Sequence, residues 1–226
     1  MMPHNAENNS VQSGTHQSEQ DTPLYAGLAR YLSAHQLHLL QTARVAVAGA
    51  GGLGSNAALM LARCDVRHML LLDDDVVEPS NLNRQQYWPR HLGRPKVEAL
   101  AELLRELNPA ISLDVRVLHL SPDNLPQLLP LCPIWLEALD APEAKTMLVE
   151  AALLHGARVA SASGMGGYGG PPMQKRRLGN LTLVGDLSTD ILMAPPLAPR
   201  VTEAAALLAD AVLECILGDA DAVPAA

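Results

Sequence analysis

The sequence predicts a single α/β domain: a Rossmann-like, doubly wound, mostly parallel sheet with extra strands and a helix at its C-terminal end. Short aliphatic runs alternate with helical patterns over residues 44–163. Such alternation favours parallel strands with helices packed on both faces. A glycine-rich turn, GAGGLG, lies between the first run and the first helical pattern. Doubly wound sheets bind their ligands at turns of this kind.

The domain is expected to cover residues 23–226. Residues 1–22 are rich in Asn, Gln, Ser, His and Thr and have almost no apolar residues, which predicts a disordered leader. Over residues 25–40, leucines recur at helical spacing and predict one or two short helices. A length of 226 residues suits one large α/β domain.

The elements of residues 44–163 follow from their patterns in order. RVAVAGA is short, apolar and β-branched, as in a buried parallel strand, and LGSNAALMLARC follows as a helix. HMLLLDDD predicts a second strand, and PKVEALAELLRELNP has apolar residues at helical spacing and ends at a proline. The next predicted elements are a strand at 112–120, a short helix at 123–131, a strand at 133–139, a helix at 142–156 and a strand at 158–163.

The C-terminal part is less regular. A glycine-rich loop at 164–170 and a basic loop, PPMQKRR, at 171–177 precede a predicted strand at 180–186. A proline-rich segment at 194–199 then leads to a final apolar helix at 201–217. These glycine and proline stretches are typical of loops laid over one domain, so no interdomain linker is predicted.

Composition limits the classes of function. Apolar residues make up 48% of the chain but Phe is absent, so the core must be aliphatic. A net charge of −8 argues against a general nucleic-acid or anionic-membrane binder. The absence of a signal peptide or long apolar span predicts a cytoplasmic protein. Cys64, Cys132 and Cys215 are isolated, which predicts neither a zinc site nor a disulfide framework, and Cys64 and Cys215 lie in apolar helical patterns as buried thiols.

The glycine turn predicts a nucleotide site. Its four glycines fit the pattern G-x-G-x-x-G after a strand and before a helix: Gly49, Gly51, Gly52 and Gly54. Glycines allow a tight turn and the close approach of a phosphate, and the helix N-terminus offers free N–H groups and a positive dipole end. The alternative is a turn without a ligand. The pattern does not distinguish NAD, FAD, S-adenosylmethionine and ATP.

An acidic triplet follows the second predicted strand, about twenty residues after the glycine turn. In that position a carboxylate accepts hydrogen bonds from ribose hydroxyls. Asp73 and Asp75 face the same side if the strand persists to Asp75, while Asp74 faces the other side. Asp73 and Asp75 are therefore the candidate ribose ligands.

A cluster of polar and cationic residues follows the acids, and a dehydrogenase has no use for it there. The cluster comprises Ser80, Asn81, Asn83, Arg84 and Lys96. Arg84 offers a planar fork of donors and Lys96 a mobile point charge, which together suit a triphosphate. Lys96 follows Pro95 at a predicted helix N-terminus, where the dipole disfavours a cation, and this indicates an anionic partner. The alternative is that both are ordinary surface cations.

GAGGLGSN, LLLDDDVVEPSNLNRQQ and GRPKVEAL occur in this order. They closely resemble the adenylating enzymes that activate ubiquitin-like proteins, including the bacterial ThiF/MoeB/HesA group. The resemblance runs from about Ala43 to Gly170. SASGMGGYGG and the later LMAP…APRV look most like the short bacterial ThiF proteins, the adenylyltransferases of sulfur-carrier activation in thiamin biosynthesis.

The resemblance implies that ATP and Mg²⁺ are used to adenylate the C-terminal Gly-Gly carboxylate of a small ubiquitin-fold carrier, with release of pyrophosphate. Gly52 would approach the phosphates and Asp75 would hold the ribose. The residues implied to line the triphosphate are Ser80, Asn81 and Arg84. Arg84 and Lys96 would stabilise the transferring phosphate, and Asp140 would hold the magnesium ion. A plain helix N-cap is the alternative for Asp140.

Several departures from the family pattern shape the expectation. The CxxC pairs that hold structural zinc in larger members are absent, so no zinc is expected. No cysteine is assigned to a covalent carrier intermediate, so a separate protein would donate sulfur. The resemblance implies a homodimer in which Arg30 would be supplied to the neighbouring site. Because the usual R-x-x-R pattern is missing, a solvated helix face is the alternative for Arg30. Ala141 stands where many relatives have Asn.

Two alternatives to an adenylyltransferase remain from the sequence. A non-catalytic family member would bind the carrier without activating it, and an NAD- or FAD-linked oxidoreductase would leave Arg84 and Lys96 without a role. The loop at 164–177 has an interpretation of its own: its glycines would let a Gly-Gly tail pass, and its basic residues would meet an acidic carrier. They equally suit an exposed, solubilising loop. The basic residues are Lys175, Arg176 and Arg177.

Overall fold

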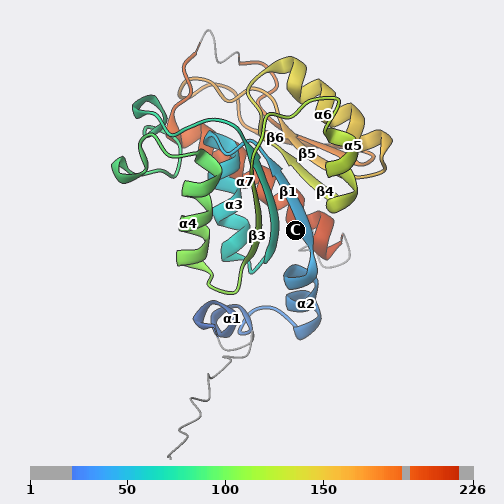
Figure 1. Cartoon of the computed structure of the whole chain (residues 1–226). Coiled ribbons are helices and arrows are strands. Elements are labelled where there is room, and N and C mark those ends of the chain that lie inside the picture. The colour runs from blue at the N-terminus through green and yellow to red at the C-terminus, as the bar shows by residue number, and fades with distance from the viewer. Residues whose placement is uncertain (1–21, 190–193, 219–226) are drawn as a thin grey trace, which may run out of the picture.

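The computed structural model describes residues 22–189 and 194–218; the expected leader, apart from Thr22, lies outside this range. One seven-stranded sheet has the order β3-β2-β1-β4-β5-β7-β6 (Figure 1). Its strands are β1 (Arg44–Ala48), β2 (His68–Asp73), β3 (Ser112–Val117), β4 (Ile134–Glu137), β5 (Arg158–Ala162), β6 (Gln174–Leu178) and β7 (Leu181–Gly185). All neighbours run parallel except β6 and β7. The predicted Rossmann-like class is confirmed.

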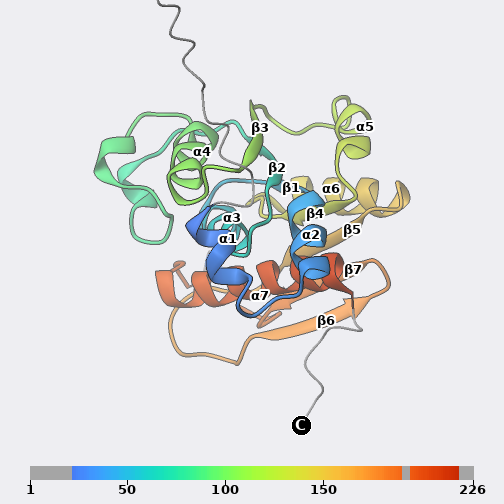
Figure 2. The same cartoon turned by 90° about the horizontal axis from the view of Figure 1, so that it is seen from below.

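Helices cover both faces of this sheet. The helices are α1 (Pro23–Leu28), α2 (Ala34–Thr42), α3 (Gly52–Arg63), α4 (Lys96–Leu107), α5 (Leu125–Leu128), α6 (Pro142–Leu154) and α7 (Ala198–Leu217). Short 3₁₀ turns are η1 (Pro79–Asn81), η2 (Pro89–His91) and η3 (Leu129–Leu131). One apolar cluster joins the sheet to α3, α4 and α7, and a second joins its other face to α5 and α6 (Figures 1 and 2).

The core is aliphatic, as expected from a sequence without Phe. In β1 every residue after Arg44 is buried, because the strand lies in the middle of the sheet with helices on both faces. Trp135 on β4 is fully buried and donates its indole N–H to the Cys132 carbonyl oxygen at 3.0 Å. Cys132 is buried, whereas Cys64 and Cys215 are only partly buried.

The amino ends of the parallel strands are covered by α1 and α2, which Figure 2 shows on that side of the sheet. The side chain of Thr22 accepts a hydrogen bond from the N–H of Tyr25 and begins α1. Ser33 and Gln36 form a reciprocal capping box that begins α2. In the part of the chain that the structure describes, no helix has both the length and the apolar character needed to cross a bilayer.

One element was predicted wrongly. The expected basic loop at 171–177 contains an edge strand, β6, paired antiparallel with β7. All five residues of β6 are exposed, so the strand carries no alternation of buried and exposed residues that would identify it in the sequence. Only Gly179 and Asn180 separate β6 from β7, so the two strands form a tight hairpin, and this Gly-Asn pair was the local signal that could have indicated it.

Two boundaries also differ from the prediction. β2 ends at Asp73, so the strand does not extend to Asp75. α7 begins at Ala198, inside the segment expected to be proline-rich loop, because a proline in the first turn of a helix blocks no hydrogen bond.

Candidate functional site

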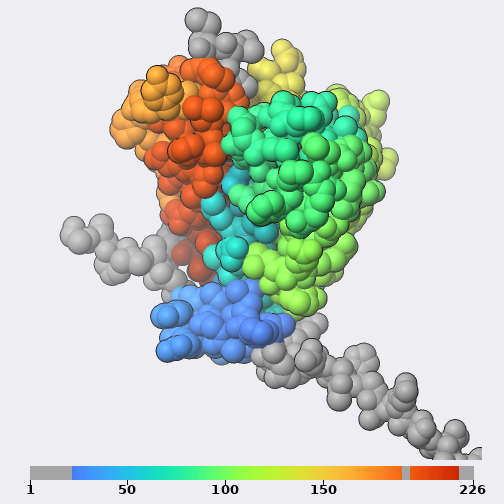
Figure 3. Space-filling model, turned by 90° about the vertical axis from the view of Figure 1, so that its left-hand side faces the viewer, coloured from blue at the N-terminus to red at the C-terminus, as the bar shows by residue number. Residues whose placement is uncertain are grey.

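The glycine turn connects β1 to α3 at the carboxyl edge of the sheet, the upper edge in Figure 1. Because β2 and β4 flank β1, the segments that leave these two strands approach the turn from either side. Figure 3 shows α3 as a strip between the C-terminal segment and the segment around α4. Ligands of open α/β sheets bind at this edge, where the strand order reverses.

Two of the four glycines serve the fold. Gly49 has a φ of 95°, and a Cβ there would lie 2.4 Å from the Ala138 carbonyl oxygen. A Cβ on Gly54 would lie 1.8 Å from the Gly49 carbonyl oxygen. Gly49 therefore allows the turn against β4, and Gly54 allows α3 to pack directly on that turn.

Of the other two glycines, Gly51 leaves the turn open, whereas Gly52 is packed against α7 and Arg84. A Cβ on Gly51 would meet only the amide nitrogen of Gln85, at 3.7 Å. A Cβ on Gly52 would lie 2.9 Å from Cγ1 of Val201 and 3.6 Å from Cγ of Arg84. Gly51 caps α3 without a side-chain hydrogen bond, so the first-turn N–H groups have no intrahelical partner. The backbone here fits an anion such as a phosphate.

Asp73 lies directly against the glycine turn. Its carboxylate accepts hydrogen bonds from the N–H of Ala50 at 2.6 Å and the N–H of Asp75 at 2.8 Å. Burial raises the pKa of Asp73, although these two hydrogen bonds and the charge of Lys96 oppose the rise. Asp75 lies beyond the strand, and its carboxylate is 2.6 Å from Nζ of Lys96. Of the two candidate ribose ligands, Asp73 is the one placed at the turn.

Lys96 is buried at the first residue of α4. Its ammonium pairs with Asp75, whose side chain is 61% exposed. Tyr87 joins this helix end to the glycine turn, because its hydroxyl lies 2.6 Å from the Ala50 carbonyl oxygen and 3.1 Å from that of Lys96. Burial, reinforced by the charge of Asp73, strongly raises the pKa of Tyr87, so its hydroxyl stays protonated as a donor.

Arg84 lies beside Gly52 on the segment after η1. Its Nη1 donates to the Ser80 carbonyl oxygen and to Oδ1 of Asn83, both at 2.9 Å. Asn83 in turn donates to the Pro196 carbonyl oxygen at 3.4 Å. One nitrogen of the guanidinium is thus anchored, while the methylene groups of the side chain lie beside Gly52.

Two polar side chains of α3, which the sequence analysis did not assign, hold this segment in place. Asn56 donates through Nδ2 to the carbonyl oxygens of Gly52 (2.6 Å) and Arg84 (2.9 Å). The hydroxyl of Ser55 accepts a hydrogen bond from the N–H of Gln86 at 3.3 Å. Both side chains are buried although they are polar, and this is the signal by which GLGSN could have indicated them.

Asn81 and Ser80 do not line the turn with free groups. Oδ1 of Asn81 accepts a hydrogen bond from the N–H of Glu78 at 3.0 Å, and its amide nitrogen lies 3.4 Å from the Ser80 hydroxyl. The Ser80 hydroxyl lies 3.4 Å from a carboxylate oxygen of Glu78. Asn81 is buried and shapes η1, the turn that precedes Arg84.

Asp140 follows β4 and is exposed. It is three residues beyond Glu137, which pairs with Ala48 at the end of β1. Within residues 22–189 and 194–218 its carboxylate has no hydrogen-bond or ion-pair partner. The N-cap of α6 is Ala141, without a side-chain hydrogen bond, so Asp140 does not cap that helix. An exposed, unengaged carboxylate at this edge fits a magnesium ion that also binds phosphates.

Another acidic group lies on the opposite flank. In the described ranges, Asp73, Asp74 and Asp75 are the one set of three potential metal-ligating side chains close enough to share an ion. Asp75 is already paired with Lys96, and a carboxylate oxygen of Asp74 lies 3.0 Å from Nδ1 of His119.

The buried base of the Asp140 loop is a closed polar cluster. Glu137 at the end of β4 is fully buried, with Nζ of Lys145 at 2.9 Å and the Ser161 hydroxyl at 2.6 Å from Oε2. The same carboxylate accepts the N–H of Leu139 at 2.7 Å. The chain leading to Asp140 is therefore fixed from below by α6 and β5.

The glycine-rich loop at 164–170 is anchored by a residue that the sequence analysis missed. Arg200, buried in the first turn of α7, donates to the carbonyl oxygens of Gly169 and Pro171 and pairs with Asp186. Burial acts to raise the pKa of Asp186, but hydrogen bonds from Thr189, Ser188 and Arg200 hold it well below its usual value. A cation in the first turn of an apolar helix was the available signal.

Lys175 and Arg176, from the expected basic set, interact with other residues of this chain. Nζ of Lys175 pairs with Asp210 and Glu214 on α7, which ties β6 to that helix. Arg176 bonds to Gln174 on its own strand.

Arg30, the candidate for a role in a neighbouring subunit, follows α1 and is exposed. The helices α1 and α2 cover the amino ends of the strands, opposite the glycine turn (Figure 1). Arg30 therefore cannot reach the turn of its own chain.

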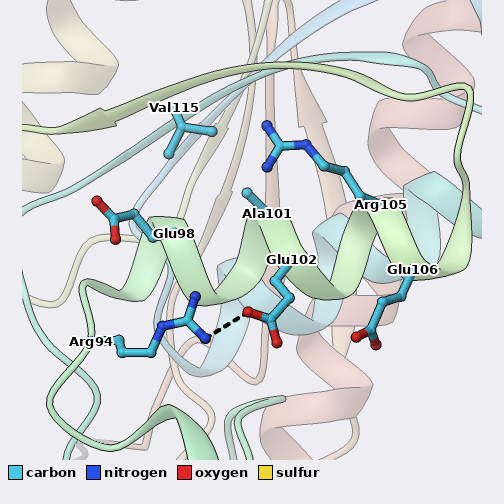
Figure 4. Close-up of a pocket in the computed structure, with 7 residues that line it drawn as sticks. All are labelled: Arg94, Glu98, Ala101, Glu102, Arg105, Glu106 and Val115. Carbon is cyan, nitrogen blue, oxygen red and sulfur yellow. Dashed lines mark hydrogen bonds and ion pairs between the residues drawn. The ribbon is translucent and has the colours of Figure 1, made fainter.

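A hollow of about 720 Å³ lies elsewhere. It is an open groove between α4 and β3, lined by Arg94, Glu98, Ala101, Glu102, Arg105, Glu106 and Val115 (Figure 4). Charges of both signs alternate there, and Arg94 pairs with Glu102 at 2.6 Å. No residue predicted for the nucleotide site lines it, and its opposed charges are typical of a solvated helix face.

Comparison with known proteins agrees with this geometry. The model of the ThiF family matches residues 25–180. The chain belongs to the ThiF family. The match spans the glycine turn, the segment of Arg84, Lys96 and Asp140, so these candidate residues lie inside the family region.

The curated relatives match somewhat more than half of the chain. It is 39% identical over 126 residues to the adenylyltransferase and sulfurtransferase UBA4 of Yarrowia lipolytica, covering 56% of this chain and 32% of that protein. The Aspergillus niger protein of the same name is 38% identical over 127 residues, covering 56% and 26%. The chain thus spans about a third or less of the length of these relatives.

Two structures are similar in fold. The E. coli tRNA N6-threonylcarbamoyladenosine dehydratase TcdA, in complex with ATP, has a TM-score of 0.77 at 24% identity and covers 88% of this chain and 97% of its own. E. coli MccB with MccA has a TM-score of 0.65 at 21% identity and covers 80% and 58%.

Proposed function

We propose that this chain is an ATP-dependent adenylyltransferase that activates the C-terminal Gly-Gly carboxylate of a small ubiquitin-fold protein. The observation that supports this best is the open glycine turn with two cations and a carboxylate beside it. Arg84 lies 3.6 Å from the position of a Cβ on Gly52, and Lys96 begins the helix that Tyr87 joins to the turn. An oxidoreductase of this fold has no use for cations beyond its dinucleotide's two phosphates.

ATP would bind with its phosphates at the start of α3 and its ribose at β2. Gly51 leaves room for a phosphate oxygen, and the unpaired N–H groups of the first helical turn would donate to it. Asp73 is the better ribose ligand, because each of its oxygens accepts one hydrogen bond and retains a lone pair. Asp75 would act indirectly by holding Lys96.

The reaction would be an in-line displacement at the α-phosphorus. A carboxylate oxygen of the carrier forms a bond to phosphorus while the bond to the bridging oxygen of the β-phosphate breaks, and pyrophosphate leaves. Arg84 and Lys96 would stabilise the negative charge on the oxygens of the transferring phosphate. Magnesium held by Asp140 would neutralise charge on the phosphates. Asn81, Ser55 and Asn56 would serve by fixing the segment of Arg84.

The carrier tail would reach the site under the glycine-rich loop. Arg200 already fixes this loop through Gly169 and Pro171, so the proposed path is largely formed without a partner. Glycines at Gly166, Gly167 and Gly169 would allow the tail's backbone to pass closely.

Sulfur would be supplied by a separate donor protein, since none of the three cysteines lies at the glycine turn: Cys64 is the C-cap of α3, Cys132 follows η3 and Cys215 lies near the end of α7. The relatives named above are UBA4 proteins, and that name does not specify thiamin synthesis. The proposal is therefore limited to the chemistry of the carrier tail, and thiamin thiazole synthesis remains one pathway in which that chemistry is used.

ATP–pyrophosphate exchange tests the proposal. Purified protein is assayed with Mg²⁺ and candidate ubiquitin-fold proteins that end in Gly-Gly, each compared with its own form lacking the last glycine. We expect exchange only with an intact tail, and a loss of about 100-fold in Arg84→Ala, as for one removed transition-state contact. Arg105→Ala, an exposed arginine of the α4 groove, is the matched control.

Three other outcomes would contradict the proposal. ATP and carrier binding without exchange would identify a non-catalytic carrier-binding protein. Oxidation of a reduced dinucleotide would identify an oxidoreductase. Exchange supported by unfractionated tRNA and not by any carrier would indicate a tRNA-borne carboxylate, the class of substrate named for TcdA.

A further inference from the structure

A small cavity lies at the amino edge of the sheet, on the face that packs against α5 and η3. Its volume is about 70 Å³. A water molecule takes up about 30 Å³ in the liquid, so the cavity has room for one small polyatomic ion. No residue predicted for the nucleotide site or the carrier tail lines it. Its polar lining comes from Arg44, His68, Ser112 and Asp114, beside the thiol of Cys132.

Three of these polar residues are neighbours on adjacent strands. Arg44 is the first residue of β1, His68 of β2 and Ser112 of β3. Arg44 is paired in register with His68, and His68 with Ser112. Residues paired in register point to the same face of a parallel sheet, about 4.8 Å apart from strand to strand. A guanidinium, an imidazole and a hydroxyl therefore form one row along the cavity.

The side chains of this row are not engaged by the protein. In the part of the chain that the structure describes, no hydrogen bond or ion pair involves the side chain of Arg44, His68 or Ser112. By contrast, Arg158, the first residue of β5, donates to the Cys215 carbonyl oxygen. An arginine can only donate, and a neutral imidazole and a hydroxyl can each donate one hydrogen bond. Donors from all three side chains are thus available to one ligand.

The acidic group of the lining is already neutralised. Both oxygens of Asp114 accept hydrogen bonds from Arg116, at 3.0 Å from Nε and 2.7 Å from Nη2. The hydrogen bond from Arg116, together with the charges of Arg116 and Arg44, holds the pKa of Asp114 below its ordinary value, against the effect of burial. Burial raises the pKa of Cys132 to about 11, so its thiol is neutral near neutral pH. The charge of Arg44 is therefore left unbalanced at this cavity.

We propose that this cavity binds a tetrahedral oxyanion such as inorganic phosphate, held by the guanidinium of Arg44, the imidazole of His68 and the hydroxyl of Ser112. Unengaged donors and an unbalanced positive charge favour an anion over a cation or a neutral molecule. A volume of about 70 Å³ favours a single tetrahedral group over a diphosphate or a nucleotide. The site is independent of the proposed adenylation, because the glycine turn lies at the opposite edge of the sheet.

Nuclear magnetic resonance of the histidine side chains in the full-length protein tests this. Sodium phosphate is added at constant pH and ionic strength, and the imidazole signals of His68 are assigned by their loss in His68→Gln. These signals should shift saturably with phosphate or sulfate, and only at about ten-fold higher concentration with acetate. Arg44→Gln should weaken the response about ten-fold or more, because a hydrogen bond between charged groups is lost, and Ser112→Ala should weaken it less. Arg63→Gln, at an exposed arginine in the last turn of α3, is the matched control.

A repeat of the titration with ATP and Mg²⁺ separates this site from the glycine turn. Phosphate bound at the turn would compete with ATP, whereas phosphate bound beside His68 would not. The inference is overturned if His68 shows no saturable shift, if Arg44→Gln responds as the wild type does, or if acetate acts as strongly as phosphate. Loss of the response in the presence of ATP would also overturn it. If the protein binds no ATP, the proposed function fails while the response of His68 to phosphate remains.

Discussion

The two ends of α3 each carry a group of buried polar residues, and these groups differ in one respect. At the C-terminal end, Asp65 accepts hydrogen bonds from Arg67, Gln41 and Asn108, at 2.9, 2.8 and 2.9 Å. Every oxygen of that carboxylate has a partner inside the chain. At the N-terminal end, the N–H groups of the first turn have no intrahelical partner.

The closed cluster at Asp65 therefore has a structural role, whereas the open end of α3 is available to a ligand. A closed polar cluster stabilises the packing of α2, α3 and α4, and nothing in it is left for a ligand. An open set is costly to the free protein and is compensated only when something binds. The same helix therefore has a structural end and a ligand-binding end, and substitutions at the two ends should separate stability from binding.

The largest effect is expected at the closed end. Asp65→Asn leaves the Arg67 guanidinium buried without its carboxylate, which should lower the free energy of unfolding by about 3–5 kcal/mol. Affinity for ATP, measured where the variant is still folded, should stay within two-fold of wild type. Urea unfolding and calorimetry check the two parts. A stable variant with weakened ATP binding would reverse the assignment of the two ends.

Gly54 and Gly51 give a second comparison, in which the expected loss of stability is smaller. Gly54→Ala would place a methyl group 1.8 Å from the Gly49 carbonyl oxygen and should destabilise the protein by about 1–3 kcal/mol or more. Gly51→Ala meets only the end of the Gln85 side chain at 3.7 Å and should change stability by less than about 1 kcal/mol.

Gly51→Ala should weaken ATP binding more than Gly54→Ala does, which is the opposite of their order in loss of stability. The added methyl of Gly51→Ala occupies the open face where a phosphate would lie, so a loss of ten-fold or more is expected. Equal ATP affinity in Gly51→Ala and wild type would show that no phosphate binds at this face.

Acid should act mainly through the closed clusters. Burial raises the pKa of Asp65, but its hydrogen bonds to Arg67, Gln41 and Asn108 prevail and hold it below the ordinary value of 3.8. A depressed carboxyl pKa contributes stability above the unfolded pKa, and this is lost as the pH falls through the folded one. The free energy of unfolding should thus fall below pH 3.8, with a shallower slope in Asp65→Asn. Identical slopes would show that Asp65 contributes nothing to acid unfolding.

The smallest effect is expected in the groove of Figure 4. Arg105→Ala on the exposed side of α4 should change the free energy of unfolding by no more than about 0.5 kcal/mol and leave ATP affinity unchanged. A clear loss of affinity would move the ligand to this groove and would contradict the view that its mixed charges are only a solvated face.

The sequence predicted the elements with strong local signals. Buried strands such as β1 and β4 are continuous apolar runs, and G-x-G-x-x-G located the turn before α3. β6 was missed because an exposed edge strand has no periodicity of its own. Residue types indicated Arg84 and Lys96, but only the structure indicates that Asp73 lies at the turn while Asp75 pairs with Lys96.

The partners of the supporting residues could not be predicted from the sequence. Ser55, Asn56 and Arg200 act through partners far along the chain, as in the hydrogen bond of Asn56 to Arg84 and that of Arg200 to Gly169.

Hydrogen exchange of the full-length protein with and without ATP and Mg²⁺ tests the contrast between the two ends most directly. We predict new protection at the amides of residues 51–54 and in the segments 83–86 and 138–140, with no change around residues 64–67 or in the groove beside α4. The first-turn amides are the most informative, because they have no helical partner in the free protein. Protection at the C-terminal end of α3, or none at residues 51–54 when ATP is bound, would contradict the account.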